Sequence, residues 1–124
     1  MATLVIAGRL PGLNEYVKAC RANKQAGARM KEDTEQIIKA YIMQQLRGKQ
    51  FADKVALKFN WYEENKRRDK DNIAFAKKFV LDALQSAGVI PGDGWKQIKG
   101  FRDEFYIDKD SPRVEIEIEK AVEA

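Results

Sequence analysis

Residues 55–72 read VALKFNWYEENKRRDKDN and join an alternating apolar segment to a charged one. Its first half places large apolar residues at positions 55, 57, 59 and 61, the period-two pattern of a strand with one buried face. Its second half places Asp69 and Asp71 inside a basic run. If this part is extended, both carboxylates point the same way, because side chains alternate along an extended chain. The sequence therefore predicts a strand that leads into a pair of acidic side chains.

This acidic pair suits a hard cation. Mg²⁺ is usually held by one or two carboxylates together with waters and substrate phosphate oxygens. The basic residues around the pair would attract a polyanion such as nucleic acid. The alternative interpretation is a solvated turn whose acids offset the neighbouring arginine charge, since charge runs usually mark solvated surface.

Two long helices are predicted from apolar spacing. The helix after the acidic pair runs from about Asn72 to Ala87, with Gly88 as its stop. The helix before the strand runs from Asp33, as its cap, to Gly48. Residues 21–31 lack clear periodicity and are interpreted as a broken helix or a mobile basic loop. Asn14 is expected to cap a helix that precedes them.

Alternating residues predict three more strands, at positions 4–10, 101–107 and 114–119. Residues 108–112 are expected to form a hairpin loop between the last two strands. The element order is then strand, helices, strand, helix, strand, strand. We therefore expect a single α+β domain over residues 1–124, with a small mixed four-stranded sheet and helices.

Composition narrows the chemistry that the chain can perform. Histidine is absent, which removes imidazole bases and histidine metal ligands. The single cysteine, Cys20, excludes an intrachain disulfide and a cysteine-cluster zinc site. The net charge is only +4, so nucleic-acid binding must be argued from where basic residues cluster. No apolar run is long enough to cross a membrane, so a soluble cytoplasmic protein without a membrane partner is expected.

Several motifs occur in a specific order along the chain. Residues 67–73 read RRDKDNI, residues 82–84 read DAL, residues 87–88 read AG, and Asp93 follows eleven residues after the start of DAL. Near the N-terminus, residues 11–16 read PGLNEY. Together these motifs resemble the RusA family of Holliday-junction resolvases, which are small homodimeric magnesium-dependent endonucleases of bacteria, phages and prophages. The resemblance covers most of the chain and implies a RusA-like fold.

The resemblance implies that three aspartates, Asp69, Asp71 and Asp93, bind Mg²⁺, with Mn²⁺ as an alternative ion and no small-molecule cofactor. It also implies a catalytic lysine on the helix. Lys78 fits best when the count runs back from the DAL motif, and Lys77 remains an alternative because this helix is longer than the family pattern. The implied activity is metal-assisted hydrolysis of phosphodiesters in four-way DNA, with roles in DNA recombination and DNA repair.

Helix geometry adds an expectation about how the aspartates meet. A helix over residues 72–87 would span ~24 Å at 1.5 Å per residue, so Asp71 and Asp93 start at opposite helix ends. Either the loop before Asp93 folds back along the helix, or a two-fold partner supplies its own Asp93. The favoured hypothesis is the composite site of a homodimer, because two cutting centres are needed to resolve a four-way junction symmetrically.

Basic residues are the candidate contacts to branched double-stranded DNA. They are Arg67, Arg68, Lys70, Lys66, Arg21, Lys24, Arg29 and Lys31. None suggests readout of base edges, so recognition of DNA shape is expected. Two other classes of function remain as alternatives: a non-catalytic DNA-binding accessory protein, and a homodimeric structural protein whose acids only balance charge.

Five further residues have competing interpretations. Asp82 is expected to be a helix charge or a partner of a nearby lysine and not a fourth metal ligand. Glu63 and Glu64 follow the strand closely enough to support the metal ligands from behind, but they are interpreted as solvated loop charges. Trp61 is assigned to the core. For Trp95 two interpretations remain, packing in the fold and stacking on unpaired bases.

Overall fold

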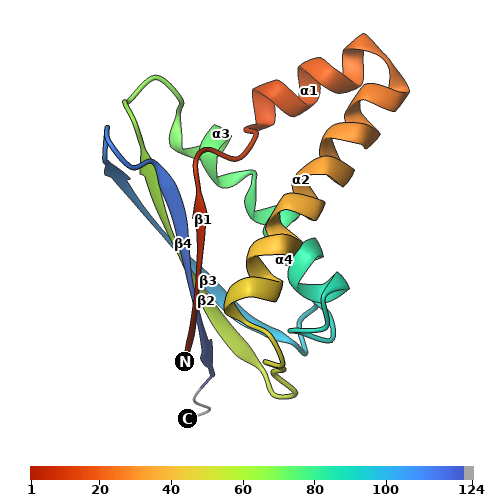
Figure 1. Ribbon diagram of the computed structural model, residues 1–124, viewed down its shortest axis with the longest axis vertical. Coiled ribbons are helices and arrows are strands. Elements are labelled where there is room, and N and C mark those ends of the chain that lie inside the picture. Colours follow the sequence, from red (N-terminus) through yellow and green to blue (C-terminus); the bar gives the residue numbers. More distant parts are fainter. Residues whose placement is uncertain (122–124) are drawn as a thin grey trace.

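A computed structural model of the chain describes residues 1–121 and arranges them as one sheet with helices on one side (Figure 1). The elements in chain order are β1 (Ala2–Ala7), α1 (Leu13–Ala22), α2 (Lys24–Gln45), β2 (Val55–Glu63), α3 (Lys70–Ala74), α4 (Lys77–Ser86), β3 (Ile98–Ile107) and β4 (Arg113–Lys120). This arrangement confirms the predicted α+β class and the predicted order of strands and helices.

The sheet of the described residues has four strands in the order β1, β4, β2, β3. β4 pairs antiparallel with both β1 and β2, whereas β3 pairs parallel with β2. The predicted hairpin at residues 108–112 is therefore wrong, because β4 does not pair with β3. The loop instead passes the end of β2, where the Asp108 amide donates a hydrogen bond of 2.8 Å to the Glu63 carbonyl.

Burial explains this strand order. Val114, Ile116 and Ile118 of β4 are all buried, as expected for a strand inside the sheet. β3 leaves Phe101 and Ile107 exposed, which suits an edge strand. The more apolar strand therefore takes the interior position, although both strands alternate in the same way along the sequence.

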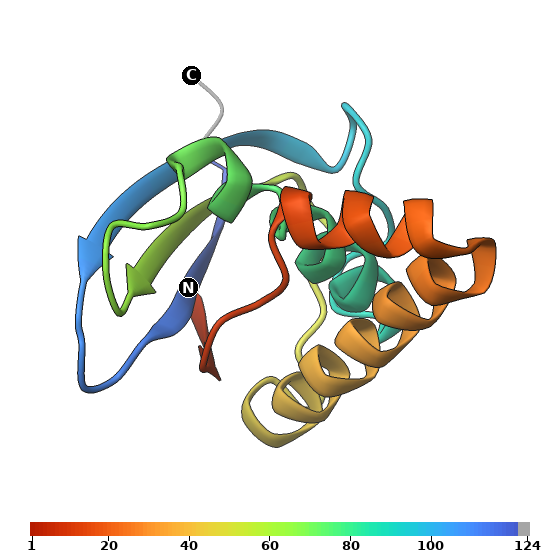
Figure 2. The same ribbon diagram turned by 90° about the horizontal axis from the view of Figure 1, so that it is seen from above.

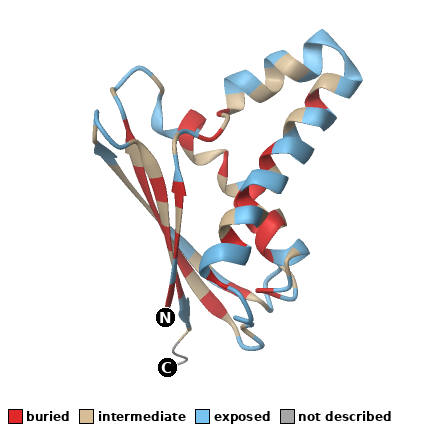
Figure 3. Ribbon diagram, viewed as in Figure 1, coloured by how far each residue is buried: buried red, intermediate tan, exposed pale blue. Residues whose placement is uncertain are grey.

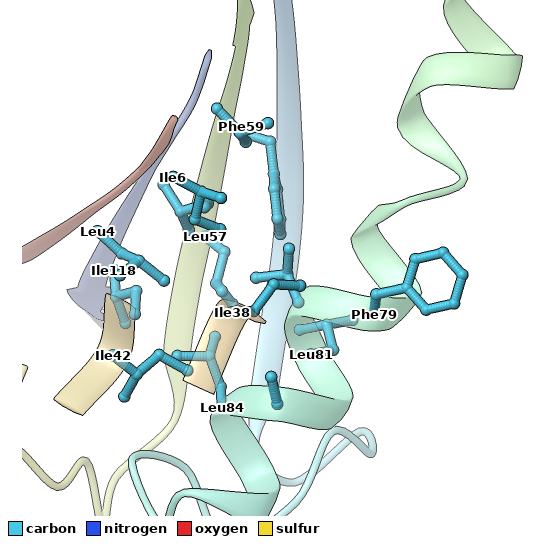
Figure 4. Close-up of a cluster of buried hydrophobic side chains, with 14 of the residues drawn as sticks. Leu4, Ile6, Ile38, Ile42, Leu57, Phe59, Phe79, Leu81, Leu84 and Ile118 are labelled. Atoms are coloured by element: carbon cyan, nitrogen blue, oxygen red, sulfur yellow. The ribbon is translucent and has the colours of Figure 1, made fainter. Parts of the chain in front are cut away.

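The helices cover only one face of the sheet (Figure 2). Side chains from β1, β2 and β4 on that face meet α2 and α4 in a buried cluster that includes Leu4, Ile6, Leu57, Phe59 and Ile118 on the sheet and Ile38, Ile42, Phe79 and Leu84 on the helices (Figure 4). The buried side of α2 faces this cluster and its other sides stay exposed (Figure 3). One-sided cover explains the alternation in the strands.

The helical hairpin of α1 and α2 agrees with one interpretation of residues 21–31 and differs from the predicted start of the second helix. α2 begins at Lys24, directly after Asn23, whose side chain accepts a hydrogen bond of 2.7 Å from the Ala26 amide. Of the two interpretations of residues 21–31, the broken helix is confirmed, because α1 ends at Ala22 and α2 begins at Lys24, and the mobile loop is wrong. Asp33 lies inside α2 and does not cap it. Gly27 does not break α2, because it packs against α1, where an added Cβ would clash with Cys20.

The helix predicted over residues 72–87 is divided into α3 and α4. Backbone bonds of the i to i+3 type join Ala76 to Ile73 and Phe79 to Ala76 between the two parts. The tighter turn brings the rings of Phe75 and Phe79 edge to face, with centroids 5.6 Å apart. Apolar spacing predicts which residues face the core, but it does not predict this break.

No helix within residues 1–121 combines the length and the apolar character that a membrane span requires.

Candidate active site

Asp69 and Asp71 lie where the loop after β2 enters α3. Asp69 is extended and precedes the helix, whereas Asp71 already belongs to the first helical turn. The prediction of an extended segment through both residues is therefore wrong. Both side chains are nevertheless exposed, and neither forms an ion pair within residues 1–121. Oδ1 of Asp71 accepts a hydrogen bond of 2.9 Å from the Asn72 amide, which leaves its other oxygen available.

An open hollow of about 610 Å³ adjoins this pair. It lies between the loop after β2, helix α3 and the carboxyl end of β3, and both aspartates line it. Lys66 and Lys70 line the same hollow, and Phe105 and Ile107 add an apolar side. The Nζ atom of Lys70 lies 5.6 Å from the centre of the Phe105 ring. Acidic, basic and apolar side chains therefore share one surface depression.

Arg68 braces the backbone that carries the pair. Its Nε and Nη2 atoms donate to the two carboxylate oxygens of Glu63 at 3.0 and 2.9 Å. Its Nη1 atom donates to the Leu10 carbonyl at 3.0 Å. The side chains of Arg68 and Glu63 are only 10% and 9% exposed. Glu63 is thus no solvated loop charge, contrary to the prediction, and Arg68 is turned inward although it was predicted to contact phosphate.

The N-terminal segment docks on the same corner. Oδ1 of Asn72 accepts a hydrogen bond of 2.9 Å from the Asn14 amide, in the first turn of α1. Asn14 is therefore not the cap that the sequence predicted, and α1 is capped by a side chain 58 positions away. A Cβ atom on Gly12 would lie 2.6 Å from Oδ1 of Asn72 and 2.9 Å from Nη1 of Arg68. Only glycine allows this close approach.

Lys78, on α4, contacts two acidic side chains that do not line the hollow of Asp69 and Asp71. Its Nζ lies 3.1 Å from Oδ1 of Asp82 and 3.7 Å from Oδ2 of Asp93. The hydrogen bond to Asp82 and the charge of both carboxylates raise the pKa of Lys78 above its ordinary 10.5. Asp82 also lies 3.7 Å from Lys31, which confirms its interpretation as a partner of nearby lysines.

Lys77 faces the sheet and has a different role in the structure. Its Nζ lies 2.6 Å from Oδ2 of Asp103 and within 5.3 Å of the ring centres of Phe59 and Phe101. The other oxygen of Asp103 accepts a hydrogen bond of 2.9 Å from Nε1 of Trp61. Trp61 is 1% exposed, so its assignment to the core is confirmed. Of the two candidate lysines, Lys78 is the one that contacts Asp93.

The three candidate metal ligands do not meet within one chain. Among residues 1–121, no group of three or more histidine, cysteine, aspartate or glutamate side chains is placed to hold a metal ion. Asp93 lines a second hollow, beside the turn between α4 and β3, and not the one that contains Asp69 and Asp71. The chain therefore presents an acidic pair at one place and a single aspartate at another.

The other candidate DNA contacts form two groups. Lys66, Arg67 and Lys70 are exposed around the acidic pair. Arg21, Lys24, Arg29 and Lys31 are exposed near the junction of α1 and α2, which projects beyond the sheet (Figure 1). The contact between Asn14 and Asn72 links the start of α1 to the corner around which the first group lies.

Comparison with known proteins identifies the family of the chain. The sequence model of the family described as Endodeoxyribonuclease RusA matches residues 12–119, almost the whole chain. No curated protein sequence matches the chain at a significant level.

Proposed function

Because the chain belongs to the RusA family of endodeoxyribonucleases, which resolve Holliday junctions, we propose that it cuts four-way DNA by Mg²⁺-dependent hydrolysis of phosphodiesters. The observation that carries the proposal is the state of Asp69 and Asp71. Both carboxylates are exposed beside a hollow, without an ion pair in the described chain, and basic side chains surround them. Two acids without ion-pair partners, beside basic side chains, suit a cation that also binds a phosphate.

The donor set fits the expected metal. Asp69 and Asp71 offer only carboxylate oxygens, which Mg²⁺ prefers and Mn²⁺ also accepts. These two residues would hold the ion, and Asp93 would complete the set. When bound, the ion lowers the pKa of an attacking water and offsets negative charge that develops on the phosphorus centre.

A second copy of the chain would bring Asp93 to the acidic pair. The separation of Asp93 from Asp69 and Asp71 within one chain supports this composite site. In a two-fold dimer the same contact occurs twice, so two cutting centres arise. This matches the need to cut two strands of a four-way junction symmetrically.

Lys78 would act as a fixed positive charge. The hydrogen bond to Asp82 raises the pKa of Lys78, which favours the protonated form and a role as a positive charge. A cation beside Asp93 would stabilise charge on the scissile phosphate. Phosphates further along the DNA arms would contact the exposed basic residues, and binding should therefore weaken steeply with salt.

Cleavage assays with a labelled four-way junction and a linear duplex, with and without Mg²⁺, test the activity. Asp69→Asn should abolish cleavage and retain junction binding, whereas Asp33→Asn, at an exposed position on α2, should cleave as the unmodified chain does. Cleavage that persists in Asp69→Asn would contradict the proposed role of the acidic pair. Junction binding without any cleavage would favour an accessory protein, and the absence of binding would favour a structural one.

Mixing inactive variants tests the composite site. Asp69→Asn and Asp93→Asn should each be inactive alone, and a mixture that exchanges subunits should regain activity. One site of the mixed dimer then carries both substitutions and the other carries neither. If Asp93 acts within its own chain, every site is defective and the mixture stays inactive. A mixture of Asp69→Asn with Asp71→Asn is the control, because it should regain nothing under either arrangement.

A further inference from the structure

The hollow beside Asp93 has two aromatic side chains in its lining. Trp95 and Phe101 line this depression of about 250 Å³ together with Asp93. Trp95 is 95% exposed and Phe101 is 43% exposed. The other tryptophan of the chain, Trp61, is buried. Aromatic rings usually stabilise a fold by burying a large apolar area. Trp95 buries almost none, so it contributes little to the stability of this fold.

The turn holds Trp95 in an outward position. The Gly94 amide donates to Oε1 of Gln97 at 3.1 Å, and the Gln97 amide donates back to the Gly94 carbonyl at 3.1 Å. The Ile98 amide also donates to the Gly94 carbonyl, at 3.0 Å. These bonds close the turn on both sides of Trp95. Its exposure therefore results from an ordered turn with its own hydrogen bonds.

The charged residues around these two aromatic side chains indicate what the hollow binds. Asp93 lies on the same hollow, and the cationic Nζ of Lys78 lies 3.7 Å from its carboxylate. Lys96, next to Trp95, is exposed. A ligand with a flat apolar face and a negatively charged backbone matches exposed rings next to Lys96, since the charge of Lys78 is already offset by Asp82 and Asp93. A nucleotide of a DNA strand has both features, and aromatic rings stack on bases of any sequence.

We propose that Trp95 and Phe101 form a stacking site for a nucleobase of the branched DNA, adjacent to the phosphate at which Asp93 acts. This inference rests on the proposed function. Bases at a branch point are easier to unstack than those inside a continuous duplex, because their pairing and stacking are already disturbed. The site would thus favour branched over linear DNA without reading base edges.

Tryptophan fluorescence tests this site independently of cleavage. The measurement uses the Asp69→Asn chain with Mg²⁺, so that DNA stays uncut. Without DNA, acrylamide should quench Trp95 strongly and the buried Trp61 weakly. Addition of a four-way junction should quench the emission of Trp95 and protect it from acrylamide, and a linear duplex should do so less. A chain that also carries Trp95→Phe should show no such change.

Substitutions of Trp95 give a second test, in which the affinity for the junction is measured by gel shift. Trp95→Ala should weaken junction binding about tenfold, since stacking on an aromatic residue contributes ~1–3 kcal/mol per base. Trp95→Phe should retain most of the affinity because it keeps a ring. Met43→Ala, which removes another exposed apolar side chain on α2, should bind as the unmodified chain does.

Three outcomes would overturn the inference. If the junction binds but Trp95 emission and the affinity of Trp95→Ala are unchanged, the stacking site is wrong and the proposed function stands. If Trp95 is shielded from acrylamide before DNA is added, a second copy of the chain covers it, and the DNA site is again wrong. If the unmodified chain does not bind the junction, both proposals fail.

Discussion

The two segments that carry the candidate metal ligands are built in different ways. The β2–α3 corner, residues 63–72, is tied to the rest of the fold by distant contacts, from Arg68 to the Leu10 carbonyl and from Asn72 to the Asn14 amide. The α4–β3 turn, residues 91–97, is closed mainly by hydrogen bonds between its own residues. The corner depends on the whole fold, whereas the turn depends on local sequence.

This difference suggests what each segment contributes. The backbone that carries Asp69 and Asp71 is held by the buried ion pair of Arg68 and Glu63, so its position is fixed as long as the core is intact. Asp93 and Trp95 lie on an exposed turn and are available to another molecule. Substitution of Arg68, which braces the corner, should therefore affect stability and activity together, whereas substitutions in the turn should affect activity far more than stability.

The largest expected effect is that of Arg68→Met. Removal of one partner leaves the buried Glu63 carboxylate uncompensated, so the free energy of unfolding should fall by about 3–5 kcal/mol. Urea denaturation measures this change. Arg67→Met is the matched control, because the neighbouring exposed arginine should affect DNA binding and not stability. A loss below about 1 kcal/mol, as for a surface pair, would show that Arg68 does not brace the corner.

Adding Glu63→Leu to Arg68→Met sharpens this test. The double variant should recover part of the lost stability, since a buried ion pair replaced by apolar residues often costs little. Additive losses would instead indicate that the two side chains act separately.

Gly12→Ala should destabilise the chain by about 1–3 kcal/mol. The new methyl group would meet Oδ1 of Asn72 and the backbone oxygen of the same residue, and the backbone cannot yield without moving α3. Gly100→Ala is the control, because no atom lies within 4 Å of its added Cβ. Thermal melts of both variants make the comparison. Equal melting temperatures would show that the N-terminal segment adapts freely.

Gln97→Ala addresses the α4–β3 turn. It removes an exposed hydrogen bond to the Gly94 amide, so stability should fall by no more than about 1 kcal/mol. Junction cleavage should decrease more than this loss explains, because the turn positions both Asp93 and Trp95. Cleavage assays and urea denaturation on the same preparation give the change in activity and the change in the free energy of unfolding. Unchanged cleavage would show that the turn needs no such closure.

The smallest effect on stability concerns Lys78. Its raised pKa means that the contact with Asp82 stabilises the fold below pH 10.5 and that this contribution is lost as the pH rises through the folded-state pKa. Asp82→Asn should move the pKa of Lys78 down towards its ordinary value. NMR titration of the Lys78 side chain measures this shift, which Asp93→Asn should produce more weakly. A pKa that Asp82→Asn leaves unchanged would contradict the assigned cause.

Local pattern predicted a large part of the fold and some of the site. The alternation at residues 55–61 located β2 and assigned Trp61 to the core, and Asp82 was correctly paired with nearby lysines. The inward role of Arg68 was not predictable. Its sequence neighbour Arg67 has the same chemistry, and only the contacts with Glu63 and Leu10 distinguish the two arginines.

The sequence by itself determined the alternation of the strands, the apolar faces of the helices that cover the sheet, the lack of imidazole ligands, and the presence of an acidic pair within a basic run. These are properties of neighbouring residues, and backbone geometry translates them directly into buried and exposed faces. Only the tertiary structure decided that β4 inserts between β1 and β2, that Asn72 caps α1, and that Asp93 lies apart from the acidic pair. Such features depend on which distant segments pack together, and the free energy of that packing is shared by the whole core.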